Sequence, residues 1–129
     1  MNLVDTFLKL ISIESETGKE DNILDFIETF LEGNNFQGEI KRNNGGIVAV
    51  PSESSKKIAL VGHVDTVPVV PNQQYEFEND DLIGGRGSVD MKGGIAVILH
   101  SLLENSSEIV GVFYTACLLY TSPSPRDRQ

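Results

Sequence analysis

The sequence predicts a layered α/β fold with a mixed sheet, in which helices pack over buried strands. Apolar residues recur at helical spacing in three segments, 3–11, 23–31 and 92–103. The runs "KKIALVGHVD" and "EIVGVFYTA" are short and continuously apolar, which is typical of buried strands. Helices that alternate with buried strands indicate an α/β architecture.

The first two helices are separated by the polar segment "SIESETG", residues 12–18. Thr17 and Glu20 have the spacing of a capping box, in which a threonine hydroxyl and a glutamate carboxylate each bind a free amide at the start of a helix. The pattern therefore predicts that Thr17 caps the helix over 23–31. Gly33 follows the last apolar residue, where a left-handed glycine often ends a helix.

A β-hairpin is predicted after the second helix. The sequence "NNGG" at 43–46 favours a tight turn between strands over 38–42 and 47–51. The strand over 56–65 is expected to be buried on both faces, and a long loop follows it. The strand over 108–116 completes the predicted sheet.

Composition and charge fit an ordinary globular domain of 129 residues and argue against several classes of partner. A net charge of −9 with no basic run argues against binding to nucleic acid or to an anionic membrane. No apolar stretch approaches the roughly 20 residues of a membrane-spanning helix, and no secretory leader is recognised. The single cysteine, Cys117, excludes an internal disulfide. We therefore expect a cytoplasmic protein with no nucleic-acid or membrane partner.

The last residues, 117–129, do not continue the α/β pattern. They begin with "CLLYTSPSPRD", which resembles the translation of a transposase-type sequencing adapter read as coding DNA. A natural disordered tail is the alternative, since serine and proline disfavour packing. We assign the domain to residues 1–116 and interpret 117–129 as a non-native tail.

Two titratable residues, His63 and Asp65, end the predicted strand over 56–65. Residues two apart in a strand point to the same face, and open α/β sheets bind ligands beyond the carboxyl ends of their strands. An imidazole binds zinc well, and a ligating histidine usually donates its other ring nitrogen to a carboxylate or carbonyl. A satisfied structural His–Asp pair explains the same spacing, so this motif alone leaves both interpretations open.

The glycine-rich segment "GGRGSVDMKGG", residues 84–94, surrounds one carboxylate, Asp90, just before a predicted helix. Glycines allow close backbone approach and unusual backbone angles. A nucleotide-binding loop is the rival interpretation. However, Asp90 occupies the place of the third glycine in G-x-G-x-x-G, and G-x-x-x-x-G-K-[ST] is not matched. A carboxylate directed into such a loop would repel phosphate and attract a metal ion.

Taken together, "GHVDTVP" at 62–68 and "GRGSVDMKGG" at 85–94 resemble the paired motifs of the co-catalytic zinc metallopeptidase and deacylase family. That family includes succinyl-diaminopimelate desuccinylases, acetylornithine deacetylases, aminoacylases and glutamate carboxypeptidases. The likeness extends over almost all of residues 1–116. Within the family, the motifs are most similar to those of the desuccinylases of the diaminopimelate/lysine pathway.

The resemblance implies roles for three residues. His63 matches the histidine that binds one zinc ion, and Asp90 matches the aspartate that bridges both ions. Asp65 matches the catalytic carboxylate that orients the histidine and supports the site electrostatically. An intact site would hold two Zn²⁺ ions, for which Co²⁺ can substitute, and two such cations need a shared anionic ligand. The resemblance also implies a cis peptide bond between Asp90 and Met91, and it assigns no substrate-binding residue.

Other residues that could carry chemistry receive simpler interpretations. His100 is expected to be packed or at the surface, and Arg86 is expected to have a structural role in the glycine-rich loop. Four acidic residues lack the spacing of a calcium loop and are expected to form a solvated edge. They are Glu76, Glu78, Asp80 and Asp81.

The family pattern stops at the end of the strand over 108–116. Relatives carry an acidic pair there, one glutamate as general base and its neighbour as a ligand of the second zinc. This chain has Cys117, Leu118 and Leu119 instead. The later metal ligands and the smaller inserted domain, which carries dimer contacts in the family, are also absent. We therefore expect the N-terminal part of a catalytic domain, inactive by itself, from a homodimeric parent.

The parent implied by the resemblance is a dizinc amide hydrolase. The expected reaction releases succinate from N-succinyl-LL-diaminopimelate, so the expected partner is a small N-acyl amino acid. Acetylornithine deacetylase, aminoacylase and a glutamate-carboxypeptidase-like exopeptidase are the alternatives within the family. A non-catalytic metal-binding or interaction domain is the alternative of another class.

Overall fold

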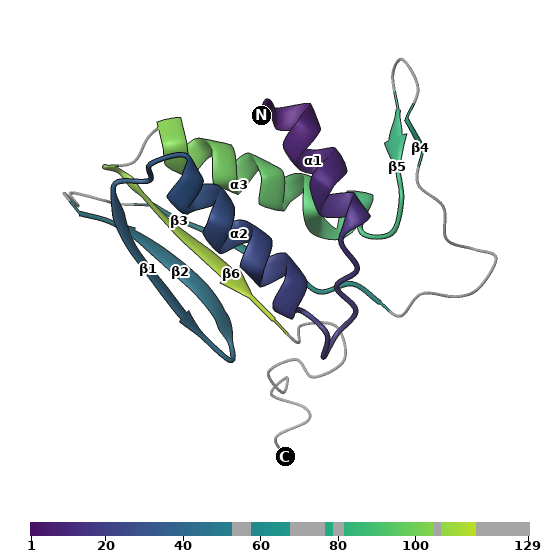
Figure 1. Ribbon diagram of the computed structural model, residues 1–129, viewed down its shortest axis with the longest axis horizontal. Helices are drawn as coiled ribbons and strands as arrows, with labels where there is room; N and C mark the ends of the chain where they lie inside the picture. Colours follow the sequence, from purple (N-terminus) through teal and green to yellow (C-terminus); the bar gives the residue numbers. More distant parts are fainter. Residues whose placement is uncertain (53–57, 68–76, 79–81, 105–106, 116–129) are drawn as a thin grey trace.

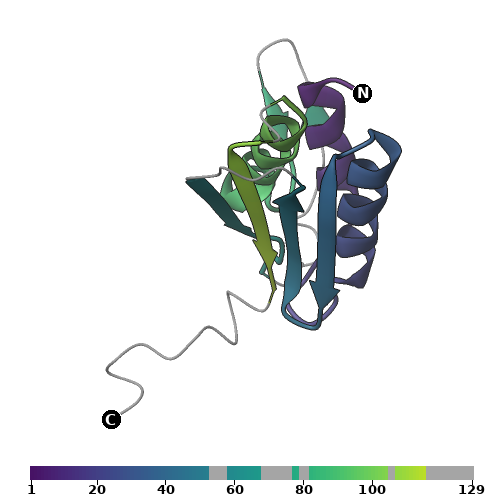
Figure 2. The ribbon, with the colours of Figure 1, turned by 90° about the vertical axis from the view of Figure 1, so that its left-hand side faces the viewer.

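The computed structural model describes residues 1–52, 58–67, 77–78, 82–104 and 107–115, which fold as a mixed sheet with helices on one face (Figures 1 and 2). The strand order in the main sheet is β1-β2-β6-β3, and β4 pairs with β5 separately. The elements are α1 (Leu3–Ser12), α2 (Asp21–Gly33), β1 (Gly38–Asn43), β2 (Gly46–Pro51), β3 (Ile58–His63), β4 (Phe77–Glu78), β5 (Ile83–Gly84), a kinked turn η1 (Ser88–Lys92), α3 (Gly93–Glu104) and β6 (Ile109–Tyr114). The predicted α/β fold class and mixed sheet are confirmed.

The core lies between the sheet and the helices and is built from the predicted apolar stripes. On the sheet side, Ile47, Ala49 and Phe113 are buried. On the helix side, the buried residues include Leu10, Ile23, Leu24, Ile27, Phe30, Leu31, Ile95, Ala96, Ile98, Leu99 and Leu102. Removal of these side chains from water supplies the main force that holds the helices on the sheet.

The pairing of β3 with β6 determines at which edge of the sheet these strands end. β3 and β6 run parallel and stay paired up to His63, which lies opposite Tyr114. β2 is antiparallel to β6, so the sheet is mixed. Both parallel strands therefore end at the same edge, which is where open α/β sheets bind ligands.

β3 is not buried on both faces, and this prediction from the sequence is wrong. Gly62 faces the helices, because a Cβ placed there would meet Met91, Ile95 and Ile98. Val61 must point the other way, since side chains alternate along a strand, and it is 53% exposed. In the part of the chain that the structure describes, β3 pairs only with β6 and helices cover only one face. The apolar run indicates a strand but does not show which of its two faces other elements cover.

The predicted N-terminal cap of α2 is also wrong. The helix begins at Asp21, and the Thr17 hydroxyl donates to Asp65 in another part of the fold. Glu20 Oε1 instead accepts the Gly18 amide at 2.7 Å. The spacing of Thr17 and Glu20 identifies groups that can meet locally, but it carries no information about a competing carboxylate far along the chain.

The C-terminal end of α2 differs from the prediction as well. The helix ends at Gly33, but the left-handed residue is Asn35, with φ of 59°. Its amide donates to the Glu32 carbonyl at 3.2 Å. Asparagine adopts left-handed backbone angles more readily than most residues, because its short polar side chain can form hydrogen bonds with nearby groups.

Some sequence predictions concern residues outside the described part of the chain. These are the tail 117–129 and the acidic side chains between 76 and 81. Among the helices that the structure describes, none has the length and apolar character needed to cross a membrane.

The hairpin turn forms as predicted and depends on Gly46. Asn43 pairs with Gly46 across the turn, and Gly46 has φ of 130°. A Cβ at this position would overlap the backbone carbonyl oxygen of Phe113. The turn therefore requires glycine both for its backbone angle and for the close approach to β6.

We predict that Gly46→Ala lowers the free energy of unfolding by more than about 2 kcal/mol, because alanine adopts positive φ poorly and its methyl group meets backbone. Gly33→Ala is the matched control, since no atom lies within 4 Å of a Cβ built there. That control should be neutral or stabilising by up to about 1 kcal/mol. Urea denaturation followed by circular dichroism measures both variants, and equal midpoints would contradict this account of the turn.

Candidate functional site

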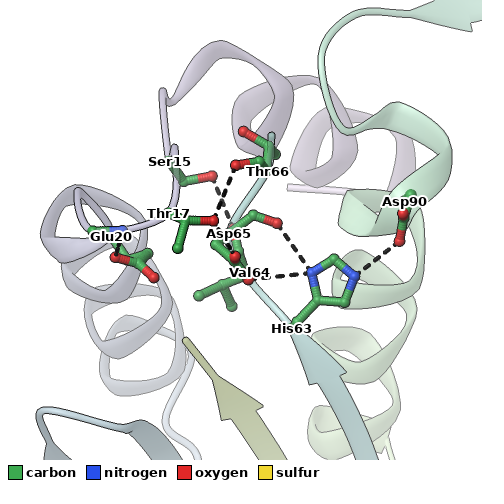
Figure 3. Close-up of polar contacts among 9 residues, drawn as sticks. Ser15, Thr17, Glu20, His63, Val64, Asp65, Thr66 and Asp90 are labelled. Carbon is green, nitrogen blue, oxygen red and sulfur yellow. Dashed lines mark hydrogen bonds and ion pairs between the residues drawn. The ribbon is translucent and has the colours of Figure 1, made fainter. Parts of the chain in front are cut away.

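The three site residues predicted from the sequence lie together at the carboxyl end of β3 (Figure 3). His63 is the last residue of β3, Asp65 follows two positions later, and Asp90 comes from η1. The Nε2 atom of His63 lies 2.8 Å from Asp90 Oδ1. The fold therefore brings a histidine and a carboxylate from segments 27 positions apart in the sequence into direct contact.

The other ring nitrogen of His63 faces Asp65. Nδ1 lies 3.0 Å from the Asp65 backbone carbonyl oxygen and 3.4 Å from its carboxylate oxygen Oδ1. Both ring nitrogens of His63 therefore face acceptor oxygens, those of Asp65 at Nδ1 and that of Asp90 at Nε2. A lone pair and a carboxylate repel at this distance unless a cation, either a proton or a metal ion, lies between them.

Burial differs sharply among the three side chains. The side chain of Asp65 is fully buried and that of His63 is 8% exposed, whereas that of Asp90 is 71% exposed. The ring of His63 also packs edge-on against Tyr114, with the ring centroids 6.2 Å apart. Asp65 and Tyr114 thus both contact the largely buried imidazole, while Asp90 presents its carboxylate to solvent.

The segment over 12–18, predicted from the sequence to separate two helices and to cap the second, contributes to this site. Ser15 Oγ donates to the Val64 carbonyl at 2.8 Å, and the Thr66 amide donates to the Ser15 carbonyl at 2.8 Å. Thr17 Oγ1 donates to Asp65 Oδ2 at 2.5 Å. Residues 15–17 therefore lie along residues 64–66, as Figure 3 shows. Nothing in the local pattern of "SIESETG" indicates this long-range pairing.

Lys92 is a second residue that the sequence analysis did not assign to the site. It is 2% exposed, and its Nζ donates to the Ile13 carbonyl at 2.6 Å, just beyond the end of α1. A cation at a helix C-terminus is favourable because the last carbonyls carry partial negative charge. Lys92 thus joins η1, which carries Asp90, to the end of α1.

The glycine-rich loop adopts a backbone that other residues would resist. Gly87 has φ of 83°, and a Cβ there would lie 2.7 Å from the Thr66 side chain. The loop therefore packs directly on the segment that follows β3, as the glycines indicated. The peptide bond between Asp90 and Met91 is cis, in agreement with the resemblance.

His100 and Arg86 lie apart from these contacts. His100 Nε2 contacts Thr6 Oγ1 at 2.7 Å, and its ring centroid lies 5.5 Å from that of Phe30, so the packed histidine expected from the sequence is confirmed. Arg86 lies in the loop, partly buried, and its Nε has no hydrogen-bond partner within the described ranges. A structural role for Arg86 stays a prediction.

The donor atoms of this site suit a metal ion but are few. Within residues 1–52, 58–67, 77–78, 82–104 and 107–115, no group of three or more histidine, cysteine, aspartate or glutamate side chains is placed to hold an ion. His63 and Asp90 offer one nitrogen and one carboxylate, which are ligand types that zinc prefers. The described residues therefore fit part of a coordination shell.

Comparison with known sequences gives one consistent family. Residues 59–117 match the model of Peptidase family M20/M25/M40. The DapE protein of Mycobacterium tuberculosis, provisionally named a succinyl-diaminopimelate desuccinylase, is 41% identical over 109 residues, covering 81% of this chain and 30% of that protein. The succinyl-diaminopimelate desuccinylase of Corynebacterium glutamicum is 38% identical over 105 residues, covering 78% and 28%. This chain spans less than a third of the length of these curated relatives.

Solved structures share the fold. An M20 family metallo-carboxypeptidase from Sulfolobus solfataricus matches with a TM-score of 0.68 at 18% identity, over 89% of this chain and 31% of that chain. A tripeptidase from Staphylococcus aureus matches with a TM-score of 0.64 at 26% identity, over 88% and 36%. The likeness to the carboxypeptidase concerns the fold alone.

We predict that Lys92→Met lowers the free energy of unfolding by about 1–3 kcal/mol, because the Ile13 carbonyl loses the donor that the buried Lys92 side chain supplies. Lys19→Met is the matched control, since the Lys19 side chain is 80% exposed and its contact with Glu16 is 4.0 Å long. The control should change stability by less than about 0.5 kcal/mol. Thermal denaturation distinguishes the two, and a Lys92→Met variant as stable as wild type would exclude this linking role.

Proposed function

The chain belongs to peptidase family M20/M25/M40, and from that premise we propose that it carries part of the metal centre of a zinc-dependent amide hydrolase. The observation that carries the proposal is the direct approach of His63 Nε2 to Asp90 Oδ1 at 2.8 Å, with Nδ1 held by Asp65. A purely structural pair has no need of an exposed carboxylate at its outer end. The exposure of Asp90 therefore favours a site that an ion can reach.

His63 and Asp90 would hold the metal, with Asp90 shared between two Zn²⁺ ions. When bound, such a pair supplies a polarised substrate carbonyl and an activated water. Asp65 would act from behind, because its carboxylate and carbonyl keep the Nδ1 proton in place and leave Nε2 available. This assignment gives each of the three residues a role that matches its burial.

The substrate that the relatives support best is N-succinyl-LL-diaminopimelate, from which succinate would be released. Two relatives near 40% identity carry the name of that desuccinylase. A peptide-bond hydrolase is the second candidate, because a tripeptidase of known structure is 26% identical to this chain. Both reactions break a linear amide bond and need the same metal centre. We keep the cytoplasm as the expected compartment.

We further propose that residues 1–116 are the N-terminal part of the catalytic domain and that 117–129 are a non-native tail. The general base and the remaining metal ligands would then follow Ala116 in the protein that the gene encodes. Leu118 and Leu119 can neither accept a proton nor bind zinc. General-base assistance is typically worth about 10²–10⁴-fold in rate, so the printed chain should be inactive.

Sequencing the genomic DNA beyond the codon for residue 116 tests the proposal. We expect an acidic pair directly after Ala116. The protein expressed from that gene should hydrolyse N-succinyl-LL-diaminopimelate with added zinc or cobalt, faster than N-acetylornithine or a tripeptide. Preference for the tripeptide would support the second candidate. Genomic DNA that encodes Cys-Leu-Leu-Tyr at 117–120 and then a stop codon would contradict the enzyme assignment.

Substitutions in that full-length enzyme should separate metal ligands from supporting groups. We predict that His63→Ala and Asp90→Ala abolish both zinc content and turnover. Asp65→Ala should retain more zinc while turnover falls strongly, because the residue supports the ligand and does not bind the ion; loss of such partners costs about 10–100-fold in metal affinity or activity. Elemental analysis beside kinetics measures both quantities. Full activity of Asp65→Ala would remove Asp65 from the site.

A further inference from the structure

The hydroxyl of Thr17 begins a series of contacts that leads through Asp65 to His63 (Figure 3). We propose that Thr17 is a positioning residue for the metal-binding imidazole: its hydroxyl fixes the Asp65 carboxylate, and Asp65 in turn fixes the tautomer and orientation of His63. The proposal rests on the proposed function only in calling His63 a metal ligand.

The first contact joins Thr17 to Asp65. The hydroxyl proton of Thr17 has two acceptors in range, Asp65 Oδ2 at 2.5 Å and the Thr66 carbonyl at 3.4 Å, and the shorter contact dominates. Asp65 is fully buried, where a carboxylate is costly unless hydrogen bonds compensate it. A hydrogen bond from a hydroxyl to a carboxylate is of the charge-assisted kind, which is stronger than a neutral one.

The second contact joins Asp65 to His63. With Oδ2 held by Thr17, the other carboxylate oxygen, Oδ1, faces Nδ1 of His63 at 3.4 Å. The Asp65 backbone carbonyl faces the same nitrogen at 3.0 Å. Loss of the Thr17 hydroxyl removes one of the bonds that orient the carboxylate, so the negative charge that favours a proton at Nδ1 is less firmly placed, while the backbone carbonyl keeps its contact. The consequence appears at Nε2, the atom that contacts Asp90.

The backbone of Thr17 is held independently of its hydroxyl. Its amide donates to the Thr66 carbonyl at 3.1 Å, and the Thr66 amide donates to the Ser15 carbonyl at 2.8 Å. The Ser15 hydroxyl adds a further bond to the Val64 carbonyl. A substitution that removes only the Thr17 hydroxyl therefore leaves the segment in place. Thr17→Val keeps the branched shape, and Thr17→Ser keeps the hydroxyl.

The chain contains two histidines, so each can report separately on its surroundings. We would record the ¹⁵N signals of both imidazoles in the metal-free 129-residue chain at one pH. Thr17→Val should shift the His63 signals away from the Nδ1–H tautomer and leave those of His100 unchanged. Thr17→Ser should match wild type. Thr6→Val is the matched control, because Thr6 contacts His100 and should move only that ring.

Zinc affinity provides the second readout, measured by competition with a chelator in the full-length enzyme, which would supply the remaining metal ligands. Thr17→Val should weaken zinc binding about threefold to tenfold, less than the roughly 10–100-fold expected for a direct partner of a ligand. In an Asp65→Ala background, the same substitution should have little further effect, because residues that act through one another are not additive. A role confined to stability would give equal losses in both backgrounds.

Three results would overturn the proposal. The first is a folded Thr17→Val variant with wild-type His63 signals and wild-type zinc affinity. The second is full additivity with Asp65→Ala. The third is unfolding of both Thr17→Val and the smaller Thr17→Ala while Thr17→Ser folds, which would assign Thr17 a structural role. A wild-type full-length enzyme that binds no zinc would instead contradict the proposed metal site, and the tautomer comparison would still decide the role of Thr17.

Discussion

The hold of Asp65 on the His63 imidazole is the interaction on which the rest of the site depends. It provides an acceptor for a proton on Nδ1 and leaves Nε2 facing Asp90. A buried carboxylate is costly unless hydrogen bonds compensate it, and the Thr17 hydroxyl supplies one of them to Asp65. The two proposed metal ligands therefore differ in burial: the His63 ring is largely buried, and the Asp90 carboxylate is exposed.

The fold delivers these groups through three separate constraints. Parallel pairing of β3 with β6 ends the strand at His63, at the edge of the sheet. The bonds between residues 15–17 and 64–66 fix the segment that carries Asp65. Lys92, buried against the end of α1, anchors η1 and with it Asp90. The first two constraints are mainly backbone hydrogen bonds, and the third is a buried side chain. They place the site on rigid elements, although the Asp90 carboxylate itself is exposed to solvent.

Periodicity and spacing in the sequence were enough to predict the helices, the hairpin and the mixed sheet, which follow from local patterns. The shared site of His63 and Asp90 was predicted from the resemblance to the zinc metallopeptidase family. The burial of β3 could not be predicted, because an apolar run does not report which face of the strand is covered. The role of Thr17 was missed for a different reason: its local spacing fits a helix cap, and the competing acceptor lies 48 positions away. Lys92 was missed because a lysine beside glycines gives no sign of burial.

The central claim is that His63 Nε2 and Asp90 bind metal while Asp65 supports the imidazole from behind. The most direct test is anomalous diffraction at the zinc edge, from crystals of the full-length enzyme grown with zinc. The account predicts a zinc peak bound to Nε2 at about 2.0–2.1 Å and also in contact with the Asp90 carboxylate, with Nδ1 still on Asp65. Zinc found only elsewhere, with His63 and Asp90 still in direct contact, would contradict it.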